Sequence, residues 1–114
     1  MSNFIALVVE DDILQRDIIV DLLRDKGLEV VECGTAEAAE LLVVKTGPEL
    51  RVLITDVALA GPMSGLQLAE YAKRRYPSLN VVLISGATPP YLPSDTTFLQ
   101  KPFRAADLMT AVMQ

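Results

Sequence analysis

Short apolar runs alternate along the chain with longer segments in which apolar residues recur at helical spacing. Runs this short, bounded by turn signals, are typical of strands buried in a parallel sheet. The segments between them predict helices that cover both faces of the sheet. Five strands are predicted, at residues 4–9, 28–33, 51–56, 80–85 and 96–100. We therefore expect residues 1–114 to form one α/β domain with a doubly wound parallel sheet.

Four helices are predicted, and the first three follow residues that can cap a helix. These caps are Asp12, Thr35 and Ser64, and Gln15 and Gln67 stand in the capping-box position after the first and the third. The helices are expected at about residues 13–27, 36–45, 65–76 and 104–113. In the first helix we expect one apolar face, formed by Leu14, Ile18, Ile19, Leu22 and Leu23.

The pattern weakens between the last two strands, where residues 86–95 include three prolines. Proline costs about 3 kcal/mol in the interior of a helix. We therefore expect no regular helix in this segment, and a loop this rich in proline is a common place for mobility.

Composition and charge exclude several classes of function. The net charge of −5 argues against nucleic-acid binding. The chain has no histidine, which excludes His-based catalysis and the usual zinc sites. The apolar runs are too short to cross a membrane, and Met1-Ser2-Asn3 carries no basic region that would suggest a signal peptide. Cys33 is the single cysteine, so we expect a cytoplasmic domain without an internal disulfide.

Residues that can do chemistry follow four of the predicted strands. Glu10 and Asp11 follow the first, Asp56 ends the third, Ser85 ends the fourth and Lys101 follows the fifth. Ligands of open α/β sheets bind at the carboxyl ends of the strands. A like-charge pair 4 Å apart costs on the order of 4 kcal/mol at an effective dielectric of 20, so this acidic cluster favours a hard cation such as Mg²⁺. With a lysine and a hydroxyl, it suits phosphoryl transfer to a carboxylate.

In this order, and each at a strand end, these residues resemble the receiver domains of two-component response regulators. The matching motifs are LVVEDD at residues 7–12, Asp56, Ser85-Gly86 and Lys101-Pro102-Phe103, and the resemblance covers essentially the whole chain. It implies a five-stranded sheet in the order 2-1-3-4-5. It also implies that a histidine kinase or phosphotransfer protein transfers a phosphoryl group to the chain. That transfer would switch a face that binds an unidentified downstream protein.

The resemblance also assigns roles in the metal site. Asp56 would be the phosphoacceptor and, like Asp11, a direct ligand of Mg²⁺. Glu10 would act through a metal-bound water, and the backbone carbonyl of Ala58 would complete the protein ligands.

Further roles concern the phosphoryl group and the switch. Lys101 would pair with Asp56 and then with a phosphoryl oxygen, and a cis peptide would precede Pro102. Ser85 would move to the phosphoryl group. Phe98 stands at the aromatic switch position, although a phenylalanine there can equally be a core residue.

The chain departs from the family pattern in two places. The loop after Asp56, residues 57–64, is one residue longer than the commonest form. Residues 86–95 replace the segment that normally holds the fourth of five helices, so we expect that helix to be missing or reduced to a turn. The site residues flank this segment, so the chemistry should survive while the output surface changes.

Three functions remain open on the sequence. The first is a phosphorylatable signalling module, which catalyses its own phosphorylation and dephosphorylation but is not otherwise an enzyme. The second is a phosphohydrolase with an aspartyl nucleophile, but Ala58 stands where such enzymes usually carry a general acid. The third is a receiver-like interaction module that does not switch.

Overall fold

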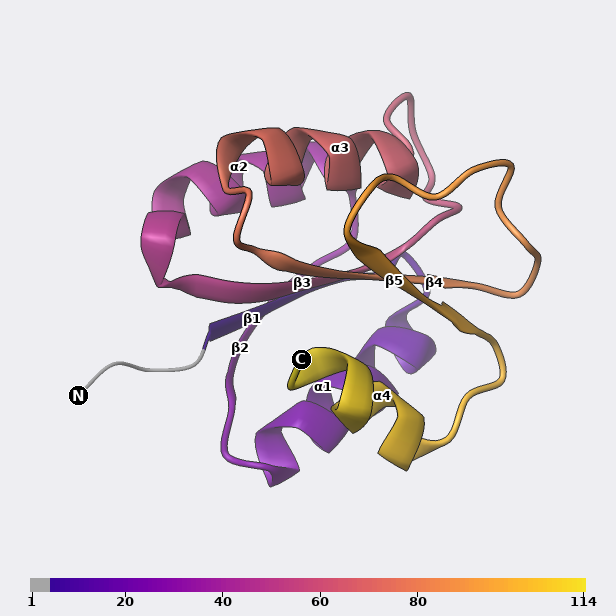
Figure 1. The fold of residues 1–114 in the computed structure, drawn as a ribbon. Coiled ribbons are helices and arrows are strands. Elements are labelled where there is room, and N and C mark those ends of the chain that lie inside the picture. The colour runs from indigo at the N-terminus through magenta and orange to yellow at the C-terminus, as the bar shows by residue number, and fades with distance from the viewer. Residues whose placement is uncertain (1–4) are drawn as a thin grey trace.

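The computed structural model describes residues 5–114, and these form a three-layer α/β fold (Figure 1). The predicted start of the first strand at Phe4, and Met1-Ser2-Asn3 before it, lie outside the described residues. Five parallel strands in the described part of the chain pair in the order β2-β1-β3-β4-β5, which confirms the expected sheet. The strands are β1 (Ile5–Val9), β2 (Glu29–Cys33), β3 (Leu50–Asp56), β4 (Asn80–Ser85) and β5 (Thr96–Gln100).

Helices cover both faces of the sheet, as Figure 1 shows. One face carries α2 (Ala36–Thr46) and α3 (Gly65–Arg75), and the other carries α1 (Ile13–Asp25) and α4 (Ala105–Val112). A short 3₁₀ turn, η1 (Gly47–Glu49), connects α2 to β3. Among residues 5–114, no helix has both the length and the apolar character needed to cross a membrane.

The alternation of side chains along the strands creates two separate cores. On β1, Leu7 and Val9 pack under α2 and α3, whereas Ala6 and Val8 pack against α1 and α4. We call these the α2/α3 core and the α1/α4 core. A central strand that is buried on both faces needs apolar side chains at nearly every position, which is why β1 and most of β4 form continuous apolar runs.

The helix starts follow the predicted caps, with one difference between α1 and α3. Ser64 and Gln67 form a reciprocal capping box at α3. At α1 the Asp12 side chain accepts the N–H of Gln15 at 3.0 Å, but the N–H of Asp12 donates to Glu10 at 3.1 Å. The expected capping box at Gln15 is therefore only half formed.

The predicted apolar face of α1 is wrong in part. Ile19, Val20 and Leu23 are buried, whereas Leu14 is 75% exposed and Ile18 is 60% exposed. Because successive helical residues are about 100° apart, Ile18 lies far around the axis from the buried face of Ile19, Val20 and Leu23. The apolar residues of α1 cover too wide an arc to be buried together, so Leu14 and Ile18 face outward.

Residues 86–95, which the structure describes in full, form no helix, as the prolines predicted. We call them the β4–β5 segment; Figure 1 shows it as the orange loop that connects β4 to β5. Tyr91 donates its hydroxyl to Glu70 of α3 at 2.9 Å, and the Thr96 hydroxyl donates to the carbonyl of Pro93 at 2.7 Å. The segment is thus attached to the domain through a few polar contacts.

Candidate functional site

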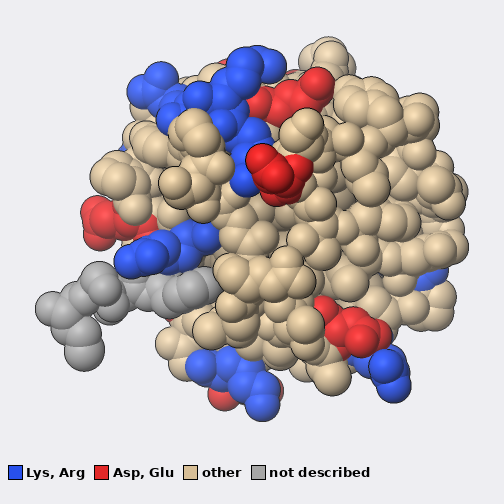
Figure 2. Space-filling view, in the orientation of Figure 1, with Lys and Arg blue, Asp and Glu red and all other residues tan. Residues whose placement is uncertain are grey.

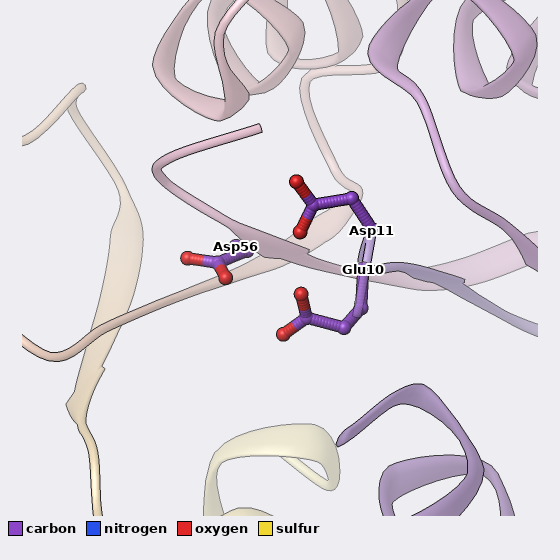
Figure 3. Close-up of side chains that lie close together, drawn as sticks. All are labelled: Glu10, Asp11 and Asp56. Atoms are coloured by element: carbon purple, nitrogen blue, oxygen red, sulfur yellow. The ribbon is translucent and has the colours of Figure 1, made fainter. Parts of the chain in front are cut away.

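The carboxyl ends of β1 and β3 bring three carboxylates together, as Figure 3 shows. Ligand oxygens of Glu10, Asp11 and Asp56 lie within 4.8 Å of one another. Glu10 is only 2% exposed, Asp56 is half-buried and Asp11 is exposed. The prediction that these acids meet at one edge of the sheet is confirmed.

Lys101, just after β5, supplies the positive charge of the site. Its Nζ donates to Oε1 of Glu10 at 3.0 Å, to Oδ2 of Asp56 at 3.0 Å and to the side-chain oxygen of Gln15. The peptide between Lys101 and Pro102 is cis, as the resemblance implied. We call Glu10, Asp11, Asp56 and Lys101 the strand-end site.

Burial and charge shift two of the ionisable groups in this site. Burial raises the pKa of Glu10, against the lowering effect of its hydrogen bonds with Lys101 and the N–H of Asp12. Burial alone would lower the pKa of Lys101, but hydrogen bonds and charge interactions with Asp56 and Glu10 outweigh it and raise that pKa. Lys101 therefore stays charged, and one ammonium faces three carboxylates.

The donor set of the site fits a hard divalent cation. All three side chains offer oxygen, and the chain has no histidine that could compete as a ligand. Three carboxylates against one ammonium leave an excess of negative charge, which a cation would neutralise. Glu10, Asp11 and Asp56 could therefore hold a metal such as Mg²⁺.

The loop after β3 is attached to the strand-end site by backbone hydrogen bonds. The N–H of Ala58 donates to Oδ1 of Asp56 at 3.3 Å, and the N–H of Ala60 donates to Oδ2 of Asp11 at 3.1 Å. These bonds hold the longer loop close to the carboxylates. The role of the Ala58 carbonyl as a metal ligand stays a prediction.

Two residues that position this loop were not identified from the sequence. A Cβ on Gly65 would overlap the carbonyl oxygen of Asp56, so the start of α3 can approach the strand end only with glycine. Glu37 of α2 accepts the N–H of Met63 at 3.1 Å. Both contacts depend on how α2 and α3 pack against the loop and the strand end, and no local pattern indicates them.

Ser85 and Phe98 lie on the two strands beyond Asp56. Ser85 is buried at the end of β4, where its Oγ accepts the N–H of Ala87 at 3.2 Å. The backbone carbonyl of Ser85 accepts the N–H of Lys101 at 2.8 Å, which joins the ends of β4 and β5. Phe98 is half-buried against the α2/α3 core, and its role as a switch stays a prediction.

Comparison with known proteins gives matches along nearly the whole chain. The sequence profile of the response regulator receiver domain matches residues 6–113. Nodulation protein W of Bradyrhizobium diazoefficiens is 34% identical over 98% of this chain and 51% of its own length. Response regulator protein FleR of Pseudomonas aeruginosa is 35% identical over 94% of this chain and 23% of its own. The chain thus spans about half or less of the length of these curated relatives.

Solved structures agree with the sequence matches. The receiver domain of the hybrid histidine kinase CckA superposes with a TM-score of 0.85 at 31% identity, covering 96% of each chain. A response regulator receiver protein from Sinorhizobium medicae gives a TM-score of 0.88 at 27% identity, covering 98% of this chain and 93% of the other. Sequence and fold therefore point to the same family.

Proposed function

The chain belongs to the response regulator receiver domain family, and on that premise we propose that it accepts a phosphoryl group on Asp56. The observation that carries this proposal is the position of Lys101 Nζ, at 3.0 Å from both Glu10 and Asp56. Three separate strands contribute to this contact, at the edge of the sheet where parallel α/β folds bind ligands.

Asp56 is the nucleophile in this proposal. Its two carboxylate oxygens are held by the N–H of Ala58 and by Lys101, so the side chain is oriented before a donor arrives. One oxygen of Asp56 forms a bond to phosphorus. The bond from phosphorus to the leaving atom of the donor breaks, and the leaving group keeps the electron pair. That atom is an imidazole nitrogen in a phosphohistidine donor and an oxygen in acetyl phosphate.

The other residues of the site would stabilise the negative charge of the phosphoryl group, directly or through a bound metal ion. Glu10, Asp11 and Asp56, with the carbonyl of Ala58, would hold Mg²⁺, which when bound neutralises charge on the phosphoryl oxygens. Lys101 donates to one phosphoryl oxygen. Ser85 Oγ already accepts the N–H of Ala87, so its own hydrogen remains to be donated to another phosphoryl oxygen.

Phosphorylation of Asp56 would change the surface of the same chain. Ser85 would move toward the phosphoryl group, and Phe98 would follow it from its half-buried position. The chain would catalyse its own phosphorylation and dephosphorylation without acting on another substrate. Its cytoplasmic location stays a prediction.

The proposal is tested by incubating the protein with Mg²⁺ and acetyl phosphate and measuring its intact mass. We expect the gain of one phosphoryl group, lost in Asp56→Asn and after removal of divalent cations with EDTA. Asp25→Asn, which changes an exposed aspartate at the end of α1, is the matched control and should gain the group normally. No gain in the wild-type protein, or a gain that survives Asp56→Asn, would contradict the proposal.

An exposed apolar surface lies beside Lys101 of the strand-end site. Leu14 and Ile18 are exposed on α1, and Ile18 lines a groove of about 440 Å³ with Pro102 and Phe103, next to Lys101. We propose that a histidine kinase or phosphotransfer protein docks on this surface. Ile18→Asp should then slow transfer from the protein donor and leave phosphorylation by acetyl phosphate unchanged; equal rates from the protein donor would rule the surface out.

The β4–β5 segment supports a second candidate function, a receiver-like module that binds partners without switching. This segment lacks a helix and is attached through few contacts, so a signal from Ser85 has no helix to move. The phosphoryl mimic BeF₃⁻ separates the two functions. Amide NMR shifts that extend beyond the strand-end site into β5 and the β4–β5 segment indicate a switch, and shifts confined to the site indicate the second function.

A further inference from the structure

The side chain of Gln15 does not form the capping-box hydrogen bond that was expected at the start of α1. At the start of α3, the corresponding Gln67 accepts the backbone N–H of Ser64 at 2.9 Å. At α1, the backbone N–H of Asp12 is already taken by Glu10. The amide oxygen of Gln15 instead accepts a hydrogen bond from Lys101.

This contact completes the hydrogen bonding of the Lys101 ammonium. A lysine ammonium has three N–H donors. Here they meet Glu10, Asp56 and Gln15, so every donor has an acceptor within the chain. The first two acceptors are carboxylates, whereas the third is a neutral amide. All three bonds have a charged donor, but only the two carboxylates add the attraction of an opposite charge, so the bond to Gln15 is the one that Lys101 gives up most easily.

We propose that Gln15 is a positioning residue for Lys101. It holds the third N–H of the ammonium beside Asp56 and releases that N–H to a phosphoryl oxygen. This inference rests on the proposed function, because it requires a phosphoryl group on Asp56. Gln15 takes no part in bond making, and its contribution is to keep Lys101 oriented without adding a fourth negative charge to the site.

The neutrality of Gln15 is the feature to test, and Gln15→Glu changes it with little change in size. A carboxylate at residue 15 would hold Lys101 more strongly and compete with the phosphoryl oxygen. We expect Gln15→Glu to accept phosphate from acetyl phosphate about tenfold more slowly. Gln15→Leu, which removes the acceptor, should slow the reaction by about two- to fivefold.

Two controls separate this role from a general effect on charge or on α1. Ile13→Glu adds the same charge to the same helical turn at an exposed residue, and it should stay within about twofold of the wild-type rate. In a Lys101→Met background, Gln15→Leu should have no further effect on the slower residual rate, because Gln15 acts through Lys101. A purely structural role of Gln15 would persist in that background.

The outcomes distinguish this inference from the proposed function. If the wild-type protein gains a phosphoryl group but Gln15→Glu behaves like Ile13→Glu, the role of Gln15 is wrong and the function stands. If Gln15→Leu slows phosphorylation by the same factor in the wild-type and the Lys101→Met backgrounds, the proposed positioning of Lys101 by Gln15 is also wrong. If the wild-type protein gains no phosphoryl group, the proposed function itself fails.

Discussion

The strand-end site and the β4–β5 segment are close in the chain, because β5 alone separates the segment from Lys101, but they are held in different ways. The site is fixed by charged groups from β1, β3 and the end of β5, and by backbone hydrogen bonds from the loop after β3. The β4–β5 segment is attached by the exposed contact of Tyr91 with Glu70 and by a local turn at Pro93.

This difference shows how a receiver fold can keep its reactive site while the connection between β4 and β5 changes. The site residues stand at the ends of strands that two buried cores hold in register, so a change within residues 86–95 does not displace them. The β4–β5 segment contributes little to these cores, and Tyr91 and Leu92 are each 48% exposed. We expect substitutions to have large effects at the site and small effects in the segment.

The largest contrast is expected between two glycines. Gly65→Ala places a methyl group against the carbonyl of Asp56, so either α3 or the strand end must move. We expect a loss of about 3 kcal/mol in the free energy of unfolding, measured by urea titration. Phosphorylation by acetyl phosphate should fall as well, because the Asp56 carboxylate shifts with its backbone.

Gly86→Ala is the matched change in the β4–β5 segment. Apart from Gly86 itself and its two chain neighbours, no described residue has an atom within 4 Å of a Cβ built on Gly86, and its φ is outside the left-handed region. We expect the free energy of unfolding to stay the same or rise by up to about 1 kcal/mol. If Gly86→Ala were as damaging as Gly65→Ala, the two regions would not differ as described.

An intermediate effect is expected from deprotonating Lys101. Its pKa in the folded protein is raised above the ordinary value of 10.5, so its charge stabilises the folded state fully below pH 10.5. That stabilisation is lost as the pH rises through the raised pKa. The difference in unfolding free energy between the wild-type protein and Lys101→Met should therefore be constant between pH 8 and 10 and shrink above pH 10.5. A difference that grows above that pH would contradict this sign.

The smallest effect is expected at the contact between the β4–β5 segment and α3. Tyr91→Phe removes the hydroxyl that donates to Glu70, on an exposed surface. The midpoint of urea unfolding should not move, but amide hydrogens and protease sites in residues 86–95 should become more accessible. Glu70→Ala should produce the same local change, and the double variant should add nothing to it. Increased exchange at β4 would instead show that the contact stabilises the sheet.

Much of this molecule could be predicted from local sequence patterns. The bounds of β4 and β5 agree with the predicted ones, because apolar runs between turn residues define them. The caps at Asp12, Thr35 and Ser64 were also predicted, since a cap depends on residues only three positions apart. The meeting of the acids and Lys101 followed from their places at the ends of parallel strands.

Contacts between distant segments were not predictable in the same way. The close approach of Gly65 to Asp56 depends on how α3 packs against β3, and the partner of Gln15 depends on where Lys101 lies after the end of β5. The apolar residues of α1 surround much of the helix, so periodicity alone does not indicate which arc faces the sheet. Such details depend on packing, which no single window of sequence contains.

The glycine at the start of α3 has a consequence for how this sequence tolerates change. A side chain at residue 65 would overlap the backbone carbonyl of residue 56, and this steric requirement does not depend on which side chain residue 56 carries. A library selected only for folding should therefore retain Gly65 while residue 56 varies, whereas selection for phosphoryl acceptance should retain both. The two selections would separate residues that build the site from residues that use it.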